Sequence, residues 1–216
     1  MEAVIFDLDG VLVDSERTWD EVRRSVVAEH GGTWKPEATR AQQGMSTPEW
    51  AQYLVDELGA NLTPERIAEV VVERMAQRYA GGPPVIEGAV NAVLAVAAKW
   101  PTAIASSSPP ILIKAFLDAT GLGSLIHVAV SSEQVSAGKP APDVYIEAAK
   151  QLGVDPAACA AVEDTTNGLL SALAAGMTVY AVPNPHFPPD ETVLAETAAV
   201  IQAISALPAA LGIPVP

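Results

Sequence analysis

The hydrophobic positions near the start of the chain form a continuous run instead of an alternating pattern. Residues 3–6 are all apolar, and the run ends in Asp7-Leu8-Asp9, which brings two carboxylates one residue apart. A strand without alternation is typical of a parallel sheet that helices cover on both faces. Ligands bind at the carboxyl ends of such strands, so the pattern places two like charges at a binding edge. A shared proton or a divalent cation commonly relieves the repulsion between two such carboxylates.

Helical periodicity replaces this pattern between residues 14 and 83. The predicted helices cover residues 16–30, 47–58 and 63–79. The second and third begin in the manner of capped helices, with the hydroxyl residue Ser46 or Thr63 ahead of a proline and a glutamate. The stretch Gly81-Gly82-Pro83-Pro84 predicts a return linker. A helical block that is entered and left by short linkers beside a ligand-binding edge is typical of a lid.

Strands and helices alternate after this linker. The strands are predicted at residues 102–105, 126–130, 158–162, 178–182 and 199–201. The helices are predicted at residues 89–99, 111–120, 143–152 and 168–175. Such alternation predicts an α/β fold with a doubly wound, Rossmann-like parallel sheet. We therefore expect a core domain formed by residues 1–13 and 84–216, into which residues 14–83 insert as a smaller, all-helical cap domain.

Composition and charge exclude several classes of protein. The 216 residues carry a formal charge of −14 with only 12 lysines and arginines, whereas nucleic-acid surfaces need basic stripes. No apolar run approaches the roughly 18 residues of a membrane span, and no signal peptide is expected. The single cysteine, Cys159, rules out an internal disulfide and agrees with a reducing compartment. We therefore expect a cytoplasmic protein, a monomer or small homo-oligomer, with neither nucleic acid nor membrane as a partner.

Polar clusters follow four segments of the predicted sheet. They are Asp7 with Asp9, Ser106-Ser107-Ser108, Lys139, and Glu163-Asp164. In a doubly wound sheet all four lie along the same edge. Transfer of a phosphoryl group to a carboxylate requires this set: a nucleophile, carboxylates for a metal, and donors for the phosphate oxygens. In this interpretation Asp7 is the nucleophile, while Asp9 protonates the leaving oxygen and later takes a proton from water.

Each of these residues also has a purely structural interpretation. Asp164 stands at a strand-to-helix junction, where an aspartate often caps the helix. Lys139 taken alone would be a solvated surface lysine. Ser106 would be an ordinary turn serine, and this interpretation suits Ser107 and Ser108 better than Ser106.

The four clusters together resemble the motifs of the haloacid dehalogenase-like phosphatase superfamily. Asp7-Leu8-Asp9-Gly10-Val11-Leu12 resembles the first motif, Ser106 the second, Lys139-Pro140-Ala141-Pro142-Asp143 the third, and Glu163-Asp164 the fourth. They stand in the order of the family and span the core from residue 3 to about residue 182. The helical block of residues 14–83 resembles the cap domain of that family.

This resemblance implies a role for each core residue. Asp7 would become an aspartyl-phosphate, and Asp9 would be the general acid and base. Mg²⁺ would be held by Asp7, by the backbone carbonyl of Asp9 and by Asp164, with Glu163 nearby or acting through water. The phosphoryl oxygens would be bound by Ser106 and Lys139. Members that resemble the true dehalogenases need no metal and only the nucleophile, so the presence of Asp9 and Asp164 favours phosphate esters as substrates.

The cap resembles the branch that contains sugar-phosphate phosphatases and β-phosphoglucomutase. Gly44-Met45-Ser46 resembles the substrate-facing Gly-x-Ser loop of this branch. The chain departs from the mutases at three places: Trp19 stands where they carry a histidine, Thr47 where they carry an arginine, and Pro109-Pro110 where they carry a Lys-Asn pair. A mutase must hold a second phosphate while its intermediate turns over. These departures therefore favour a hydrolase.

Two further residues are singled out beyond the core motifs. Arg40 is the cap residue that we rank first for binding an anionic tail of the substrate. His186 lies in the Pro-rich loop of residues 183–189, at the same predicted edge, and no role is assigned to it.

The sequence thus predicts a Mg²⁺-dependent phosphatase that hydrolyses a small phosphorylated metabolite, such as a sugar phosphate, through an aspartyl-phosphate. Two alternatives stay open. One is a phosphosugar mutase of the β-phosphoglucomutase type, and the other is a non-catalytic protein that binds a phosphorylated ligand and regulates a partner. The intact pair of Asp7 and Asp9 weighs against the second alternative, because a binding protein has no need of an acid and base.

Overall fold

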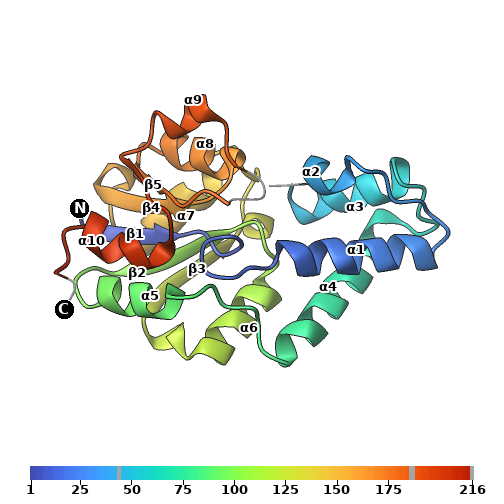
Figure 1. Cartoon of the computed structure of the whole chain (residues 1–216), viewed down its shortest axis with the longest axis horizontal. Helices are drawn as coiled ribbons and strands as arrows, with labels where there is room; N and C mark the ends of the chain where they lie inside the picture. Colours follow the sequence, from blue (N-terminus) through green and yellow to red (C-terminus); the bar gives the residue numbers. More distant parts are fainter. Residues whose placement is uncertain (43–44, 185–187, 215–216) are drawn as a thin grey trace.

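A parallel sheet of six strands forms the centre of the protein (Figure 1). The computed structural model describes residues 1–42, 45–184 and 188–214, so Gly44 and His186 lie outside the described residues. The strands are β1 (Ala3–Phe6), β2 (Thr102–Ser106), β3 (Ile126–Ser131), β4 (Cys159–Glu163), β5 (Thr178–Ala181) and β6 (Ala199–Val200). After β1, each strand lies where the sequence predicts it, with its ends shifted by at most one residue.

The strand β1 occupies an inner position, because the order across the sheet is β3-β2-β1-β4-β5-β6. Ile5 stands opposite Ala103 of β2 on one side and opposite Ala161 of β4 on the other. The chain builds β2 and β3 on the first side, and then returns to build β4, β5 and β6 on the second. Ligands bind beyond the carboxyl ends of strands where the winding reverses in this way. The topology therefore puts Asp7 at the expected binding edge.

Helices cover both faces of the sheet, which explains the continuous apolar run in β1. The core helices are α5 (Ala89–Ala97), α6 (Pro110–Thr120), α7 (Asp143–Leu152), α8 (Thr166–Ala174), α9 (Glu191–Leu194) and α10 (Leu207–Ala210). Single 3₁₀ turns occur at η1 (Leu122–Ser124), η2 (Ser132–Gln134), η3 (Pro156–Ala158) and η4 (Ile204–Ala206). Val4 and Phe6 pack in one buried cluster with α5 and α6, whereas Ala3 and Ile5 pack in another with α7 and α8. Both faces of β1 are therefore buried away from solvent.

A block of helices stands beside the sheet and lies between β1 and α5 in the chain (Figure 1). In the part of the chain that the structure describes, these helices are α1 (Glu16–Glu29), α2 (Ala38–Ala41), α3 (Thr47–Asp56) and α4 (Pro64–Ala80). The helix α4 packs against α1 and α3, and the apolar side chains of Val26, Leu54 and Val71 are fully buried. The sequence does not predict α2, because four residues are too few to show a periodic pattern.

The capping contacts confirm the predicted starts of α3 and α4. The backbone amide of Ser46 donates to Oε2 of Glu49 at 2.7 Å. The hydroxyl of Thr63 accepts a hydrogen bond from the amide of Arg66 at 3.3 Å. Such caps typically stabilise a helix by about 1 kcal/mol each. Local sequence therefore decides where these cap helices begin.

Two chain segments run side by side between the helical block and the core. Val13 forms an antiparallel bridge with Val85, the Asp14 amide donates to the Pro84 carbonyl at 2.8 Å, and the Ile86 amide donates to the Leu12 carbonyl at 3.0 Å. The predicted boundaries of the cap domain, residues 14 and 83, lie next to these contacts. The division into two domains at these residues stays a prediction. The fold class itself, a doubly wound parallel sheet with an inserted helical cap, is as predicted. None of the described helices combines the length and the hydrophobicity that a membrane span requires.

Candidate active site

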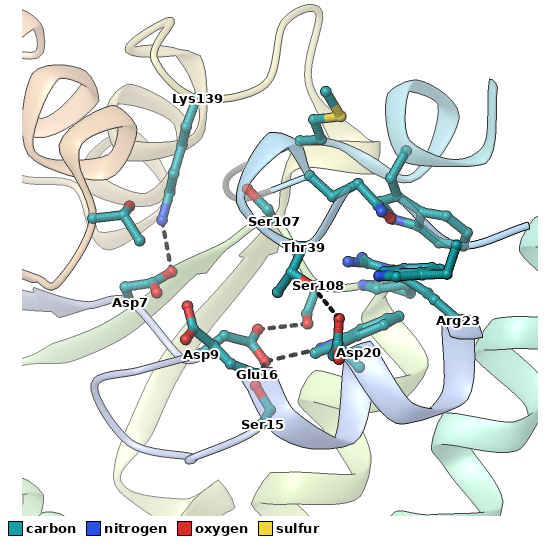
Figure 2. Close-up of a pocket in the computed structure, with 17 residues that line it drawn as sticks. Asp7, Asp9, Ser15, Glu16, Asp20, Arg23, Thr39, Ser107, Ser108 and Lys139 are labelled. Carbon is teal, nitrogen blue, oxygen red and sulfur yellow. Dashed lines mark hydrogen bonds and ion pairs between the residues drawn. The ribbon is translucent and has the colours of Figure 1, made fainter. Parts of the chain in front are cut away.

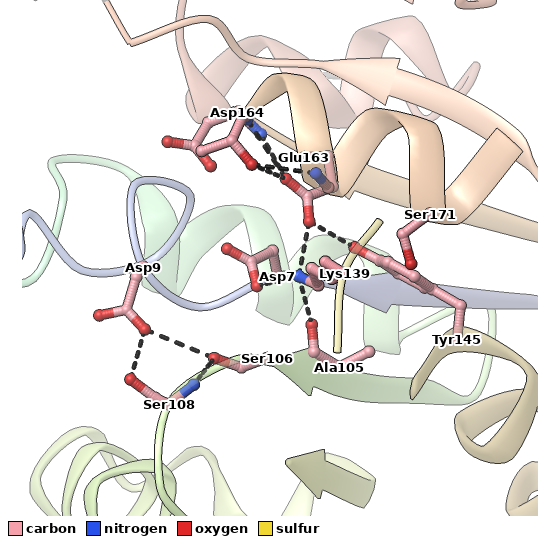
Figure 3. A network of polar contacts seen from close by, with 12 residues as sticks. Asp7, Asp9, Ala105, Ser106, Ser108, Lys139, Tyr145, Glu163, Asp164 and Ser171 are labelled. Carbon is pink, nitrogen blue, oxygen red and sulfur yellow. Dashed lines mark hydrogen bonds and ion pairs between the residues drawn. The ribbon is translucent and has the colours of Figure 1, made fainter. Parts of the chain in front are cut away.

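The predicted core residues meet at the carboxyl ends of three adjacent strands (Figure 3). Asp7 follows β1, Ser106 is the last residue of β2, and Glu163 is the last residue of β4 with Asp164 directly after it. Lys139 reaches the same place from the loop before α7. Because β1 lies between β2 and β4, the three strand ends converge on Asp7.

Lys139 is a buried cation that ties two of these carboxylates together. Its Nζ lies 2.6 Å from Oδ1 of Asp7 and 2.6 Å from Oε1 of Glu163, and it donates to the Ala105 carbonyl at 3.1 Å. The three protons of the ammonium group thus each have an acceptor. Burial lowers the pKa of Lys139, but the two carboxylates outweigh this effect and raise it above the ordinary value. Only 7% of the residue is exposed, so the surface-lysine interpretation is wrong.

Glu163 is fixed in place by contacts to both of its oxygens. Oε1 accepts hydrogen bonds from Lys139 and from the hydroxyl of Tyr145, the latter at 2.9 Å. Oε2 accepts from the backbone amides of Asp164 at 3.0 Å and Thr165 at 3.3 Å. The residue is fully buried. Glu163 therefore orients Lys139, and its oxygens are already occupied by protein donors.

Asp164 is the exception in this otherwise paired cluster. Both of its carboxylate oxygens are buried, and neither has a hydrogen-bond partner among the described residues. Burial raises the pKa of Asp164 well above its ordinary value, and Glu163 and Asp7 raise it further. The N-cap of α8 is Thr165, whose hydroxyl accepts from the Gly168 amide at 3.1 Å. The helix-cap interpretation of Asp164 is therefore wrong.

The donor set at this edge fits a hard divalent cation. One carboxylate oxygen from each of Asp7, Glu163 and Asp164 lies within 4.8 Å of the other two. Burial raises the pKa of Asp7 to about 8, although Lys139 lowers it, so the negative charge at this position is also poorly compensated. A buried carboxylate without a partner is costly, and carboxylate oxygens are preferred ligands of Mg²⁺. Asp7 and Asp164 are the available ligands, because Glu163 is engaged elsewhere.

Gly10 leaves the space that the Asp164 carboxylate occupies. Its φ is +85°, and a Cβ built at this position would lie 1.9 Å from Oδ2 of Asp164. We expect Gly10→Ala to lower the free energy of unfolding by about 2 kcal/mol or more and to weaken the stabilisation that a divalent cation gives at Asp164. Thermal unfolding with Mg²⁺ and with EDTA measures both effects.

The matched control for this change is Gly31→Ala. Gly31 also has a positive φ, of +78°, but no heavy atom lies within 4 Å of the position that a Cβ would take there. Gly31→Ala should therefore cost only the backbone strain and leave the Mg²⁺ effect unchanged. Equal losses in the two variants, with equal Mg²⁺ effects, would show that Gly10 does not shape the metal site.

Asp9 joins the core to the first cap helix. Its Oδ1 accepts hydrogen bonds from the hydroxyl of Ser15 and from Nε1 of Trp19, the latter at 3.3 Å. Its Oδ2 accepts from the hydroxyls of Ser108 at 2.6 Å and Ser106 at 3.4 Å. The carboxylate of Asp9 is thus oriented by donors from β2 and its following loop on one side and from the start of α1 on the other.

The three serines from the end of β2 onward differ in their contacts. The hydroxyl of Ser106 accepts from the Ser108 amide at 3.0 Å, which is a turn contact. Ser107 and Ser108 line the pocket, whereas Ser106 does not. The Ser107 hydroxyl is buried and has no hydrogen-bond partner among the described residues. Three successive serines look alike in the sequence, and only the folded turn decides which of them line the pocket.

A pocket lies between the strand ends and the cap, with Asp7 and Lys139 on one side and Arg23 on the other (Figure 2). The core contributes Asp7, Asp9, Ser107, Ser108, Pro109, Lys139 and Thr165. The segment of residues 15–50 contributes Ser15, Glu16, Trp19, Asp20, Arg23, Trp34, Thr39, Gln42, Met45 and Trp50. A molecule that reacts at Asp7 would therefore touch the cap with its other end.

Neither of the predicted cap residues that the structure describes, Arg40 and Ser46, lines this pocket. Arg40 is exposed on α2 and does not line it. Ser46 is engaged by Glu49, which accepts from its hydroxyl at 2.6 Å, and a Cβ on Gly138 would lie 3.4 Å from the Ser46 Cβ. Gly44 falls outside the described residues. The Ser46 loop therefore meets the segment that leads into Lys139.

Arg23 is the cap cation that lines the pocket, and the sequence does not single it out. It follows Trp19 by four residues, which puts the two side chains on the same face of α1. That spacing was the available signal. The spacing alone does not identify Arg23 as a pocket residue. Its guanidinium is enclosed only because Trp50, from α3, packs on its other side in the folded cap.

Comparisons with known proteins agree with this architecture. The family model for haloacid dehalogenase-like hydrolases matches residues 1–176. YhcW of Bacillus subtilis (strain 168) is 33% identical over 85% of this chain and 84% of its own length. Hexitol phosphatase B of Escherichia coli (strain K12) is 31% identical, again over 85% of this chain and 84% of its own length.

A solved structure extends the likeness to the whole fold. CbbY from Rhodobacter sphaeroides, in complex with phosphate, superposes with a TM-score of 0.87 at 25% identity, and the match covers 98% of this chain and 99% of that chain. The prediction of an enzyme of the phosphatase class is confirmed. The chain belongs to the haloacid dehalogenase-like hydrolase family.

Proposed function

We propose that the protein is a Mg²⁺-dependent phosphatase that hydrolyses a small phosphorylated metabolite, of the sugar-phosphate class, through an aspartyl-phosphate. The observation that carries this proposal is the pair of Asp7 and Asp164 in a pocket beneath the cap. Asp7 lines the pocket, and the buried carboxylate of Asp164 beside it has no hydrogen-bond partner among the described residues. The name of the hexitol phosphatase, a relative of similar length, supports the substrate class.

Asp7 is suited to be the nucleophile. Lys139 holds its Oδ1 at 2.6 Å, while no hydrogen bond from a described residue engages Oδ2. In the first half-reaction Oδ2 attacks phosphorus, the ester bond to the leaving oxygen breaks, and Asp9 gives that oxygen a proton. In the second, Asp9 takes a proton from a water molecule as the water oxygen attacks phosphorus, which releases phosphate and regenerates Asp7.

Three groups of this chain would hold Mg²⁺: the carboxylates of Asp7 and Asp164 and the backbone carbonyl of Asp9. When bound, the ion neutralises the charge that these carboxylates and the phosphate oxygens bring together. Glu163 serves indirectly, because it fixes Lys139. Ser106 and Lys139 stay our proposal for the phosphoryl oxygens, and the unpartnered hydroxyl of Ser107 is a further donor on the same wall.

Two features of the described residues favour hydrolysis over a mutase reaction. Trp19 stands at the position where mutases carry a histidine, and its indole N–H donates a hydrogen bond to Asp9 at 3.3 Å. Pro109, at the position of a lysine, lines the pocket and has no N–H to donate. Neither residue therefore offers a free proton donor at the two positions where a mutase would use one to hold its second phosphate.

Phosphate release from p-nitrophenyl phosphate and from a panel of phosphorylated sugars and polyols tests this function. We expect turnover with Mg²⁺, its loss with EDTA, and a higher Mg²⁺ requirement for Asp164→Asn because one ligand charge is removed. Turnover that survives EDTA, or a panel without any turnover in Mg²⁺, would contradict the proposal. Conversion of a hexose 1-phosphate to a 6-phosphate ahead of free sugar would point instead to the mutase.

A further inference from the structure

Arg23 is clamped between two aromatic side chains of the cap. The carbon at the centre of its guanidinium lies 4.7 Å from the ring centroid of Trp19 and 4.7 Å from that of Trp50. The two indoles are 6.0 Å apart and inclined by 58°. Stacking on aromatic faces immobilises a guanidinium and leaves the N–H groups at its edge for other partners. The side chain is therefore held in one orientation before any ligand arrives.

The edge of this guanidinium has no acceptor among the described residues. Its neighbours on α1 are ion-paired, Arg17 with Glu21 at 3.0 Å and Arg24 with Asp20 at 2.6 Å. Arg23 makes no hydrogen bond or ion pair with any described residue, and its Nε is buried without a partner. This is unusual, because a buried donor without an acceptor costs free energy.

A second donor among the residues that line the pocket is also unsatisfied. Nε1 of Trp34 is buried and has no acceptor within the described ranges. Both Trp34 and Arg23 line the pocket, and both unsatisfied atoms are N–H groups. A ligand in this pocket that carries oxygen acceptors would supply partners of the kind that these donors lack.

The positive charge of Arg23 also favours an anionic ligand. Burial lowers the pKa of Arg23 to about 10, although Asp9 and Asp20 raise it, so the guanidinium stays charged at neutral pH. The charge of Lys139 across the pocket is already matched by two carboxylates at 2.6 Å. The charge of Arg23 has no such direct partner among the described residues.

We propose that Arg23 binds a second oxyanion of the substrate, at the end remote from the phosphate that reacts at Asp7. The preferred substrate is then a phosphate monoester that also carries a carboxylate or a second phosphate, and the matching neutral polyol phosphate is a poorer substrate. The planar guanidinium, fixed by Trp19 and Trp50, presents a fork to two oxygens of this group, and charge-assisted pairs of this kind are the strong ones. This inference rests on the proposed phosphatase function.

Substrate pairs that differ only at the remote end test the inference. Sorbitol 6-phosphate is compared with 6-phosphogluconate, and fructose 1-phosphate with fructose 1,6-bisphosphate, by kcat/KM for release of the first phosphate. We expect the wild-type enzyme to prefer the oxyanion member of at least one pair, and Arg23→Gln to reduce that preference by roughly 10- to 100-fold. The pair that responds tells whether the second group is a carboxylate or a phosphate.

Two variants control for charge and for folding. Arg17→Gln removes the same charge from the same helix, but the Arg17 side chain is 88% exposed, so the preference should not change. Arg23→Lys keeps the charge without the planar fork and should give an intermediate preference, which serves as the readout if Arg23→Gln does not fold. Preference of the wild type for the neutral member of both pairs, or equal losses on both members, would overturn the inference.

A binding measurement separates this inference from the phosphatase proposal. If no ester is turned over, the phosphatase proposal fails, and calorimetric titration with 6-phosphogluconate and sorbitol 6-phosphate still reports on Arg23. Binding of the acid that is at least about ten-fold tighter than binding of the alcohol, and that is lost in Arg23→Gln, would support the oxyanion site. Equal binding of the two compounds would contradict it.

Discussion

Asparagine in place of Asp7 is expected to reduce kcat by on the order of 10⁴-fold or more, because the amide cannot form the acyl-phosphate bond. The change is nearly isosteric, and Lys139 keeps Glu163 as a partner at 2.6 Å. The fold should therefore persist, with an unfolding midpoint close to that of the wild type. Phosphate release, together with the intact mass of protein quenched during turnover, reports both the rate and the phosphorylated enzyme.

The control for this variant is Asp118→Asn. Asp118 is exposed on α6 and pairs with Lys114, so its loss should change kcat by less than about two-fold. A tenth or more of the activity remaining in Asp7→Asn, or a mass increase of one phosphoryl group in that variant, would exclude Asp7 as the nucleophile.

Methionine in place of Lys139 is expected to lower the free energy of unfolding by about 3–5 kcal/mol, in addition to abolishing turnover. The side chain lies 2.6 Å from both Asp7 and Glu163, and it is buried with them. Methionine fills a similar volume but leaves two buried carboxylates without their cation. Denaturant unfolding in EDTA measures this loss without the contribution of a metal.

Two further variants serve as controls for this loss of stability. Lys114→Met removes a surface lysine whose side chain is 72% exposed, and it should cost less than about 1 kcal/mol. Adding Glu163→Gln to Lys139→Met removes one uncompensated charge and should restore part of the stability. A loss below about 1 kcal/mol for Lys139→Met would mean that the buried pairs are not maintained in solution.

Local patterns were sufficient to predict most of the fold. The continuous apolar run of β1 predicts burial on both faces, and Val4 and Ile5 do pack into different clusters. The capping sequences at Ser46 and Thr63 mark the true starts of α3 and α4. Such signals are short-range, so they can be read along the chain without knowing how its elements pack.

The candidate site could be predicted only as a set of residues that share one edge. Polar residues after β1, β2 and β4 converge because the order of a doubly wound sheet brings these strands together. The partner of each residue did not follow from this argument. Lys139 bridges Asp7 and Glu163, while Asp164 is left without a hydrogen-bond partner among the described residues.

The sequence by itself determined the class of fold, the helical insertion, and the identity of Asp7, Asp9, Lys139 and Asp164 as candidates. Only the tertiary structure decided which cap residues face them. Arg40 and Arg23 both lie on cap helices, yet Arg40 is exposed, whereas Arg23 is stacked between indoles of α1 and α3 inside the pocket. That difference depends on how α1 and α3 pack, and helix packing is set by contacts between residues far apart in the chain.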